Sequence, residues 1–240
     1  MTLSALPTHA VLFDMDGVLI DSEPLICRAA MAGLAEFGIH AQAADFLPFV
    51  GAGEDRYIGG VAEAYGKTYV SEMKRRVYAR YLDLVARDGH PFPGVPELLR
   101  TLHEQNIPFA VASSADRIKV DANLLAMGVP RAWFGAVLAG EDATRKKPAP
   151  DLYLAAATRL GVPPAACCVV EDAIHGVAAA RAAGMRCAAV ATSFSAAQLL
   201  KAGAHVVRAS LAELTLADLG RGRVGVTDTH GRARTNSCNR

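Results

Sequence analysis

The chain begins with a strand pattern and then changes to a helical one. Residues 10–13 (AVLF) form a short unbroken apolar run, which is typical of a strand buried on both faces of a parallel sheet. In the next part of the chain apolar side chains recur at helical spacing, and no strong strand pattern is present. Helices are predicted there over residues 23–37, 42–50, 54–65 and 69–87.

After residue 90, short apolar runs alternate with helical patterns. Strands are predicted over residues 108–112, 136–139, 167–170, 186–191 and 204–207. Helices are predicted over residues 96–105, 116–127, 149–160, 174–183, 196–202 and 211–219. Because strands that alternate with helices form parallel sheets with right-handed crossovers, we expect an α/β fold. It would consist of a Rossmann-like parallel sheet core with an inserted α-helical cap domain.

These patterns divide the chain into three parts. Residues 1–19 and 91–219 are expected to form the Rossmann-like core. Residues 20–90 are expected to form the helical cap, inserted after the first strand and large enough for a small subdomain. Residues 220–240 are rich in arginine and have almost no apolar periodicity, which predicts a flexible tail. A basic contact segment is the alternative for the tail.

Composition is that of a globular protein. With 240 residues and 52% hydrophobic content, the chain can bury a substantial core. A formal net charge of +1 does not indicate a nucleic-acid or membrane-surface binder, so we expect neither partner. The first residues lack the basic start and apolar run of a secretory signal, which makes a cytoplasmic location the expectation.

The cysteines give no sign of a disulfide framework or a metal site. The chain has five, an odd number, and their spacing is not that of metal ligands. They are Cys27, Cys167, Cys168, Cys187 and Cys238. We expect them to be reduced thiols.

Carboxylates follow two of the predicted strands. Asp14 and Asp16 come directly after the first strand, and Glu171 and Asp172 after the fourth. Because open α/β folds bind ligands beyond the carboxyl ends of their strands, we expect these acids at one site. Exposed turn-forming acids are the alternative. Carboxylates held together repel unless a cation lies between them, and oxygen ligands favour Mg²⁺.

Candidate anion ligands lie at the same edge of the predicted sheet. Ser113 and Ser114 follow the second strand, where hydroxyl and backbone N–H groups can hold an anion. An ordinary helix cap near Asp116 is the alternative. Lys147 precedes a helix that opens with prolines, and it is suited to bind a phosphate oxygen or to pair with Asp14. Plain surface charge is the alternative for this lysine.

Four segments, in this order, resemble the motifs of the haloacid dehalogenase superfamily. They are DMDGVLIDSE, Ser113 after an apolar strand, Lys147 in KKPAPD, and VVEDAIHGVAAARAAGM. The helical insertion resembles the cap of the branch that contains β-phosphoglucomutase and sugar-phosphate phosphatases. This resemblance implies a mobile cap with hinges near residues 19–22 and 89–94.

The resemblance also implies roles for these residues. Asp14 would be the nucleophile that becomes an aspartyl phosphate, and Asp16 the general acid and base. Ser113, Ser114 and Lys147 would bind the transferring phosphoryl group. Magnesium would be held by Asp14, the main-chain carbonyl of Asp16 and Asp172, with Glu171 as a further ligand or acting through water.

Departures from the family pattern bear on the type of reaction. The mutase branch has a histidine twelve residues after the nucleophile, and this chain has Ile26 there, which argues for hydrolysis. Lys146 replaces the glycine usual before the motif lysine. His175 follows the fourth strand and is expected at an exposed helix start, with ligand contact as the alternative.

Substrate choice would lie in the cap segment 49–60. Gly51, Glu54 and Arg56 are the candidate specificity residues, with an exposed helix charge as the alternative for Arg56. Tyr57 is as compatible with the packing inside the cap as with a substrate contact. The residues together predict a magnesium-dependent phosphatase of a small sugar or sugar-acid phosphate, as a monomer or weak dimer. The alternatives are a hexose phosphate mutase and a non-catalytic phosphometabolite-binding protein.

Overall fold

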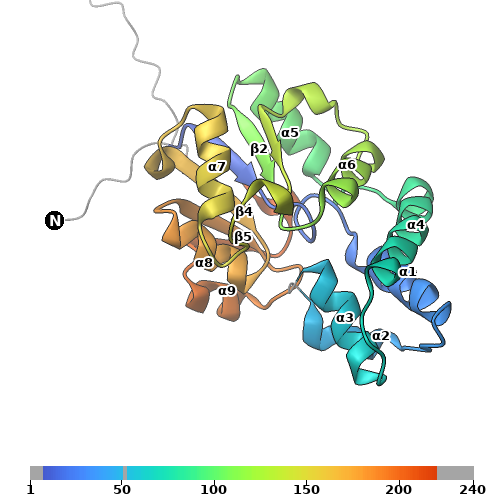
Figure 1. The fold of residues 1–240 in the computed structure, drawn as a ribbon. Coiled ribbons are helices and arrows are strands. Elements are labelled where there is room, and N and C mark those ends of the chain that lie inside the picture. The colour runs from blue at the N-terminus through green and yellow to red at the C-terminus, as the bar shows by residue number, and fades with distance from the viewer. Residues whose placement is uncertain (1–7, 51–52, 221–240) are drawn as a thin grey trace, which may run out of the picture.

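The computed structural model describes residues 8–50 and 53–220. Within these residues a six-stranded, all-parallel sheet has the order β3-β2-β1-β4-β5-β6 (Figure 1). The strands are β1 (Ala10–Phe13), β2 (Phe109–Ala112), β3 (Ala136–Leu138), β4 (Cys167–Glu171), β5 (Arg186–Val190) and β6 (Val206–Arg208). The predicted fold class is confirmed. The strand order reverses direction between β1 and β4, which is where such sheets form binding crevices.

Alternating residues of the central strand β1 enter two separate cores. Val11 and Phe13 lie in the core covered by α5 (Val95–Glu104) and α6 (Arg117–Ala126). Ala10 and Leu12 face the opposite core, together with buried residues of three other helices. Those helices are α7 (Asp151–Leu160), α8 (Ile174–Ala182) and α9 (Ala196–Ala202). Helices on both faces explain why β1 is fully buried and unbroken in its apolar character.

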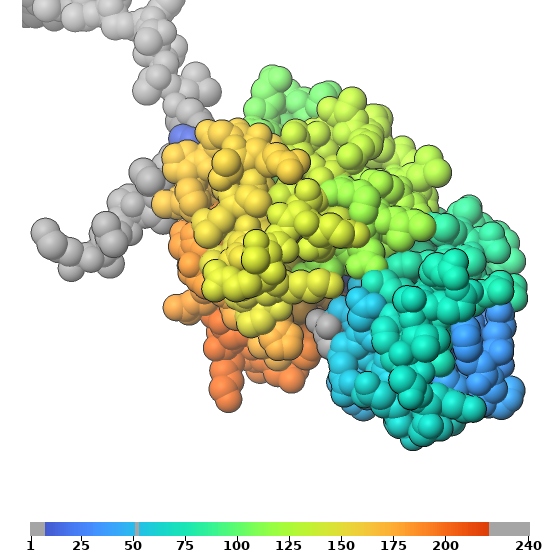
Figure 2. Space-filling model, in the orientation of Figure 1, coloured from blue at the N-terminus to red at the C-terminus, as the bar shows by residue number. Residues whose placement is uncertain are grey.

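A helical block follows β1 and packs beside the sheet. It consists of α1 (Glu23–Ala35), α2 (Ala43–Phe46), α3 (Glu54–Ala64) and α4 (Ser71–Asp88). In Figure 2 the block, coloured blue to teal, lies directly against the yellow-green part of the α/β region. Helix α4 contacts both α1 within the block and α6 outside it. The limits of the cap, residues 20–90, stay a prediction.

The two linkers of the helical block lie side by side. Ile20 forms an isolated antiparallel bridge with Pro91. The backbone N–H of Phe92 donates to the carbonyl of Leu19 at 3.1 Å. The chain therefore leaves the α/β part and returns to it at the same place. That these linkers act as hinges stays a prediction.

Two predicted helices differ from the structure. The helix expected over residues 42–50 ends with α2, and a 3₁₀ turn (Leu47–Phe49) follows, because Pro48 cannot continue an α-helix. The helix expected over residues 211–219 is wrong, since only the 3₁₀ turn Leu211–Glu213 forms there. Thr215 and Asp218 bond each other's backbone N–H groups, and such local side-chain bonds compete with helix.

Some predictions fall on residues that the structure does not describe. Residues 221–240, including Cys238, and the candidate specificity residue Gly51 lie outside the described residues. Within the described part the cysteines are free thiols, as expected. No helix in that part is both long and apolar enough to cross a membrane.

Candidate active site

Asp14 and Asp16 follow the carboxyl end of β1, just before a tight turn that begins at Gly17. The backbone N–H of Asp14 donates to the carbonyl of Val170 at 3.0 Å, which fixes this end of the strand beside β4. Gly17 then adopts φ +78°, a conformation that other residues rarely take. A Cβ atom at Gly17 would lie 2.0 Å from Asp172 Oδ2. Glycine therefore allows the first and fourth strand ends to meet.

Lys147 joins the carboxylates of these two strands. Its ammonium lies 2.5 Å from Asp14 Oδ1 and 2.8 Å from Glu171 Oε1. It also lies over the ring of Tyr153, 4.6 Å from the ring centroid. Burial alone would lower the pKa of Lys147, but the charges of Asp14 and Glu171 outweigh burial and raise it. Lys147 is therefore a buried cation at neutral pH.

Both oxygens of Glu171 have protein partners. Oε1 accepts from Lys147 and from the Tyr153 hydroxyl, the latter at 2.7 Å. Oε2 accepts from the backbone N–H groups of Asp172 and Ala173 at 2.9 and 3.0 Å. Gly176 is packed against this carboxylate, since a Cβ there would lie 1.6 Å from Oε1. Glu171 is thus held rigidly and orients Lys147.

Asp14, Glu171 and Asp172 can supply ligands to one metal ion. Each offers a carboxylate oxygen, and these atoms lie within 4.8 Å of one another. Burial raises the pKa of Asp14 to about 7, with Glu171 and Asp16 adding to the shift and Lys147 opposing it. Burial and the charges of Glu171 and Asp14 raise the pKa of Asp172 well above its usual range. One lysine does not balance three buried acids, so the oxygen-only donor set suits a hard divalent cation.

Residues after β5 complete the surroundings of Asp172. The Ser193 hydroxyl donates to Asp172 Oδ2. The Thr192 hydroxyl donates to the carbonyl of Gly17 at 2.5 Å and lies 3.4 Å from the same Asp172 oxygen. These contacts fix the orientation of a carboxylate that the sequence identified as a candidate metal ligand.

Asp16 has different surroundings from Asp14. Within the described residues its contacts all involve Oδ1, which accepts from Ser22, from Asn123 at 3.3 Å and from Lys119 at 3.1 Å. No contact of Oδ2 with the described residues is seen, and Asp16 lines the cavity described below. The Asp16 side chain is not a member of the acidic cluster, and a main-chain role toward a metal stays a prediction.

The two serines after β2 differ in their contacts. Ser113 is buried, and its Oγ accepts from the backbone N–H of Ala115 at 3.1 Å. Its hydroxyl hydrogen can still be donated to a ligand. Ser114 Oγ is buried and has no hydrogen-bond partner among the described residues. Since an unpaired buried hydroxyl is costly, Ser114 is well placed to receive an anion.

A cavity of about 260 Å³ opens at this end of the sheet. Its lining includes most of the predicted site residues: Asp14, Asp16, Glu54, Ser113, Ser114, Lys147, Glu171 and Asp172. Ile26, Phe49, Val50, Tyr57 and Phe194 supply apolar walls. The site thus lies between the α/β part and the helical block.

Other candidates lie at the edge of the site or away from it. Arg56 pairs with the exposed Glu63 at 2.6 Å and is not among the residues that line the cavity. His175 is exposed but contributes to the lining. Lys146 is exposed, and its ammonium would meet a Cβ at Gly53 at 3.3 Å.

Several residues of the site were not predicted. Lys119, Asn123, Tyr153 and Ser193 contact the candidate acids from three different parts of the chain. Ser193 lies shortly after the end of β5. The other candidates also follow strand ends, and the same criterion would have identified Ser193. Lys119 and Asn123 carry no such signal, because only the packing of α6 turns them toward β1.

Comparisons with known proteins agree with this geometry. Residues 8–184 match the family model described as haloacid dehalogenase-like hydrolase. Hexitol phosphatase B of Escherichia coli O157:H7 is 34% identical over 88% of this chain and 96% of its own length. The chloroplastic protein SUPPRESSOR OF QUENCHING 1 of Arabidopsis thaliana is 46% identical over 88% of this chain, which spans only 20% of that protein.

A solved structure extends the similarity to three dimensions. It is a crystal structure of a CbbY mutant from Rhodobacter sphaeroides in complex with xylulose-(1,5)bisphosphate. The TM-score is 0.79 at 28% sequence identity, and the match covers 88% of this chain and 99% of that chain.

Proposed function

Because the chain belongs to the haloacid dehalogenase-like hydrolase family and has relatives named as phosphatases, we propose that it is a phosphoric monoester hydrolase that dephosphorylates a small sugar or sugar-acid phosphate. The reaction would depend on Mg²⁺ and pass through a phosphoryl group bound to Asp14. A single observation carries the proposal: Asp14 and Asp16 leave one strand end but have separate partners. Lys147 pairs with the first acid, and Lys119 with the second.

Asp14, Asp172 and Glu171 are the residues that would hold Mg²⁺, and their clustered, buried oxygens suit it. The bound ion would neutralise these carboxylates and stabilise negative charge on the phosphoryl oxygens. Its presence would also lower the pKa of Asp14, which burial holds near 7, and keep the nucleophile ionised.

In the first step an Asp14 carboxylate oxygen attacks phosphorus. The bond between phosphorus and the ester oxygen of the substrate breaks, and Asp16 gives its proton from Oδ2 to that leaving oxygen. Lys147 and the Ser113 and Ser114 hydroxyls bind the phosphoryl oxygens, where charge is spread in the transition state.

In the second step water attacks the phosphorus of phospho-Asp14. Asp16 is now ionised and takes a proton from that water, while the bond between phosphorus and the Asp14 oxygen breaks. Inorganic phosphate is released and both aspartates return to their starting states. Ser22, Asn123 and Lys119 keep Asp16 oriented in both steps, because their contacts to Oδ1 do not involve the oxygen that exchanges the proton.

Hydrolysis is favoured over the mutase alternative by Ile26. Ile26 lines the cavity at the position where the mutase branch has a histidine, and an apolar side chain cannot bind a sugar hydroxyl there. A non-catalytic binding protein is disfavoured because none of the motif acids is missing. The monomeric or weakly dimeric state and the cytoplasmic location stay predictions.

The proposal is tested by phosphate release from a panel of phosphomonoesters with Mg²⁺. Asp14→Asn should abolish release, whereas Asp83→Asn, a change of the same kind at an exposed position of α4, should leave it unchanged. Wild-type turnover by Asp14→Asn would overturn the nucleophile assignment. Glucose 1-phosphate should give free phosphate, and an isomeric hexose phosphate as the product would favour the mutase.

A further inference from the structure

We propose that Glu54 selects substrates whose non-phosphate part is uncharged and carries a hydroxyl, and rejects those that carry a second anionic group. This inference rests on the phosphatase function proposed above and narrows its substrate class. It excludes the sugar-acid phosphates and bisphosphates and retains neutral sugar and polyol monophosphates.

Glu54 has one carboxylate oxygen that the protein leaves unsatisfied. It is the first residue of α3, and only 9% of its side chain is exposed. Oε1 lies 3.4 Å from the Lys119 ammonium. Oε2 is buried and has no hydrogen-bond partner among the described residues, although Glu54 lines the same cavity as Asp14. Since a buried acceptor without a donor is costly, a hydroxyl of a bound ligand would be stabilised there.

Glu54 lies on the side of the cavity where the leaving group must extend. Lys119 connects it to Asp16, with 3.1 Å from the ammonium to Asp16 Oδ1. Asp16 serves the oxygen that links phosphorus to the rest of the substrate. The carbon skeleton therefore runs past Asp16 toward Glu54 and away from Lys147, which pairs with Asp14 and Glu171.

The charge on this side of the cavity is unfavourable for an anion. Lys119 is the single buried cation here among the described lining residues, and it is shared by Asp16 and Glu54. Glu23 is a further acid close enough to interact with the same three charges. Because Lys119 is already paired with Glu54, a second phosphate or a carboxylate on the substrate would find no free buried cation here and would lie beside the Glu54 carboxylate.

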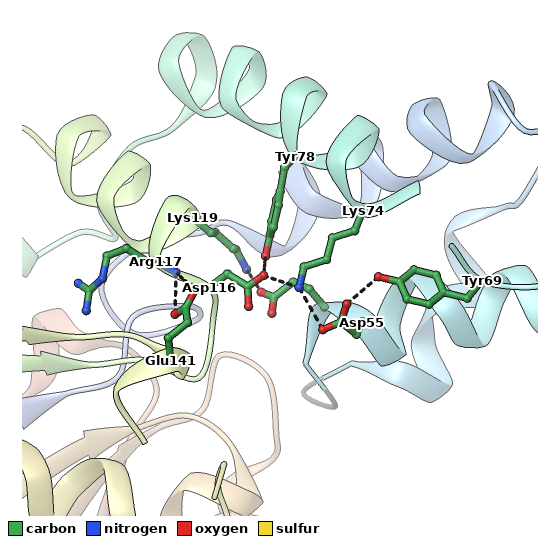
Figure 3. A network of polar contacts seen from close by, with 9 residues as sticks. Asp55, Tyr69, Lys74, Tyr78, Asp116, Arg117, Lys119 and Glu141 are labelled. Carbon is green, nitrogen blue, oxygen red and sulfur yellow. Dashed lines mark hydrogen bonds and ion pairs between the residues drawn. The ribbon is translucent and has the colours of Figure 1, made fainter. Parts of the chain in front are cut away.

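Nearby cations of the helical block have other partners. Arg56 pairs with Glu63 on the exposed side of α3. Lys74 lies between Asp55 and Asp116, at 3.0 and 2.5 Å, and Figure 3 shows this contact within the polar network between the block and α6. Tyr69 and Tyr78 donate to the same two aspartates. Both cations therefore already have acidic partners.

The remaining walls suit an uncharged carbon skeleton. Ile26, Phe49, Tyr57 and Phe194 face the cavity and offer no charge. Such surfaces pack against the C–H faces of a sugar or polyol, while one polar group, Glu54, fixes its hydroxyl. The arrangement recognises the neutral ester by one hydrogen bond and rejects the anionic ester by repulsion.

The test compares matched esters that differ in one group. Sorbitol 6-phosphate and 6-phosphogluconate differ at the terminal carbon, which is a primary alcohol in one and a carboxylate in the other. Glycerol 3-phosphate and 3-phosphoglycerate form a shorter pair. The wild-type kcat/KM should be at least about tenfold higher for the neutral member of each pair that is hydrolysed. For a pair that is not turned over, the same ratio is measured from inhibition of para-nitrophenyl phosphate hydrolysis.

Glu54→Gln should reduce this ratio to about threefold or less, mainly because kcat/KM for the anionic ester rises. Glu104→Gln, the same change at an exposed position of α5, is the matched control and should leave the ratio unchanged. Equal kcat/KM values of the wild type for both esters of a pair would overturn the inference. The same holds if Glu54→Gln leaves the ratio of these values unchanged. The phosphomonoester panel separates the two proposals: if no ester releases phosphate, the phosphatase function itself is wrong, whereas hydrolysis without discrimination contradicts only the role of Glu54.

Discussion

The ammonium of Lys119 lies 3.1 Å from Oδ1 of Asp16, and only 5% of the lysine side chain is exposed. Glu54 of the helical block lies on its other side. Burial alone would lower the pKa of Lys119, but the charges of Asp16 and Glu54 outweigh burial and hold it well above its usual range. The buried ammonium of Lys119 thus connects Asp16, the proposed general acid and base, to Glu54, the proposed specificity residue.

Lys119→Met should destabilise the protein by about 3 kcal/mol, because it leaves buried acids without their cation. Urea unfolding at neutral pH measures this free energy. Lys201→Met, at an exposed position of α9, is the control and should change stability by no more than about 0.5 kcal/mol.

The same variant tests the pairing with Glu54. In Lys119→Met the carboxylates of Asp16 and Glu54 face each other without compensation, so adding Glu54→Gln should relieve repulsion. The double variant should be more stable than the sum of the single changes predicts, by about 1 kcal/mol. Strict additivity would show that the two residues do not interact.

The raised pKa of Asp14 predicts how stability depends on pH without metal. The ordinary pKa of an aspartate is 3.8, and that of Asp14 in the folded protein is about 7. Between these pH values the folded state keeps a proton on Asp14 that the unfolded state has released. The associated stability is present below about pH 4 and is lost as pH rises through about 7. Urea midpoints measured in EDTA should therefore fall over this range, and less steeply in Asp14→Asn.

Magnesium should act most strongly where these acids are ionised. Adding Mg²⁺ should raise the urea midpoint of the wild type more at about pH 8 than at about pH 5, and should raise that of Asp14→Asn less. This measurement needs no substrate. The same response in both proteins would remove Asp14 from the set of metal ligands.

Tyr153→Phe isolates the hydroxyl that holds Glu171. The ring beneath Lys147 remains, while the hydrogen bond to Glu171 Oε1 is lost. We expect kcat to fall about tenfold through less exact placement of Lys147, with a stability loss of about 1 kcal/mol. Steady-state phosphate release and urea unfolding measure both effects. Tyr65→Phe loses a hydroxyl that bonds Asp45 on the surface, and its kcat should be that of the wild type.

Gly176→Ala should be destabilising although alanine is the better helix former. In an exposed helix the change would add about 1 kcal/mol of stability, but here the new Cβ would lie 1.6 Å from Glu171 Oε1. We expect a net loss of about 2 kcal/mol together with reduced kcat, since Glu171 must move away from Lys147. Gly66→Ala meets no atom within 4 Å and should cost about 1 kcal/mol from its φ of +72° without loss of kcat. A more stable, fully active Gly176→Ala would contradict this packing.

Most elements could be predicted because local signals and the final fold agree. Ala10–Phe13 and Ala196–Ala202 have the predicted bounds, since one is an unbroken apolar run and the other lies between Ser195 and Gly203. The helix expected near the end of the described chain failed for the opposite reason. Leu211, Leu214 and Leu219 are buried at spacings that resemble a helix, but the bonds between Thr215 and Asp218 hold the backbone in turns.

The candidate site could be predicted only where it depends on strand ends. Asp14, Lys147 and Glu171 lie together as expected, because the parallel order of the strands determines where they meet. Asn123 donates to Asp16 across 107 positions of sequence, and no local pattern indicates that contact. The side chains that orient the reacting acids come from helices. Tertiary packing determines which face of each helix points toward the sheet, and a single sequence does not show that packing.

The paired linkers at Ile20 and Pro91 make the helical block an insertion whose two ends coincide. A segment with coincident ends can be lengthened, shortened or exchanged for another without displacing the strands on either side. The residues that choose the substrate can therefore diverge while those that handle phosphorus stay in place, so that new specificities arise by replacing one loop-like unit on an unchanged catalytic scaffold.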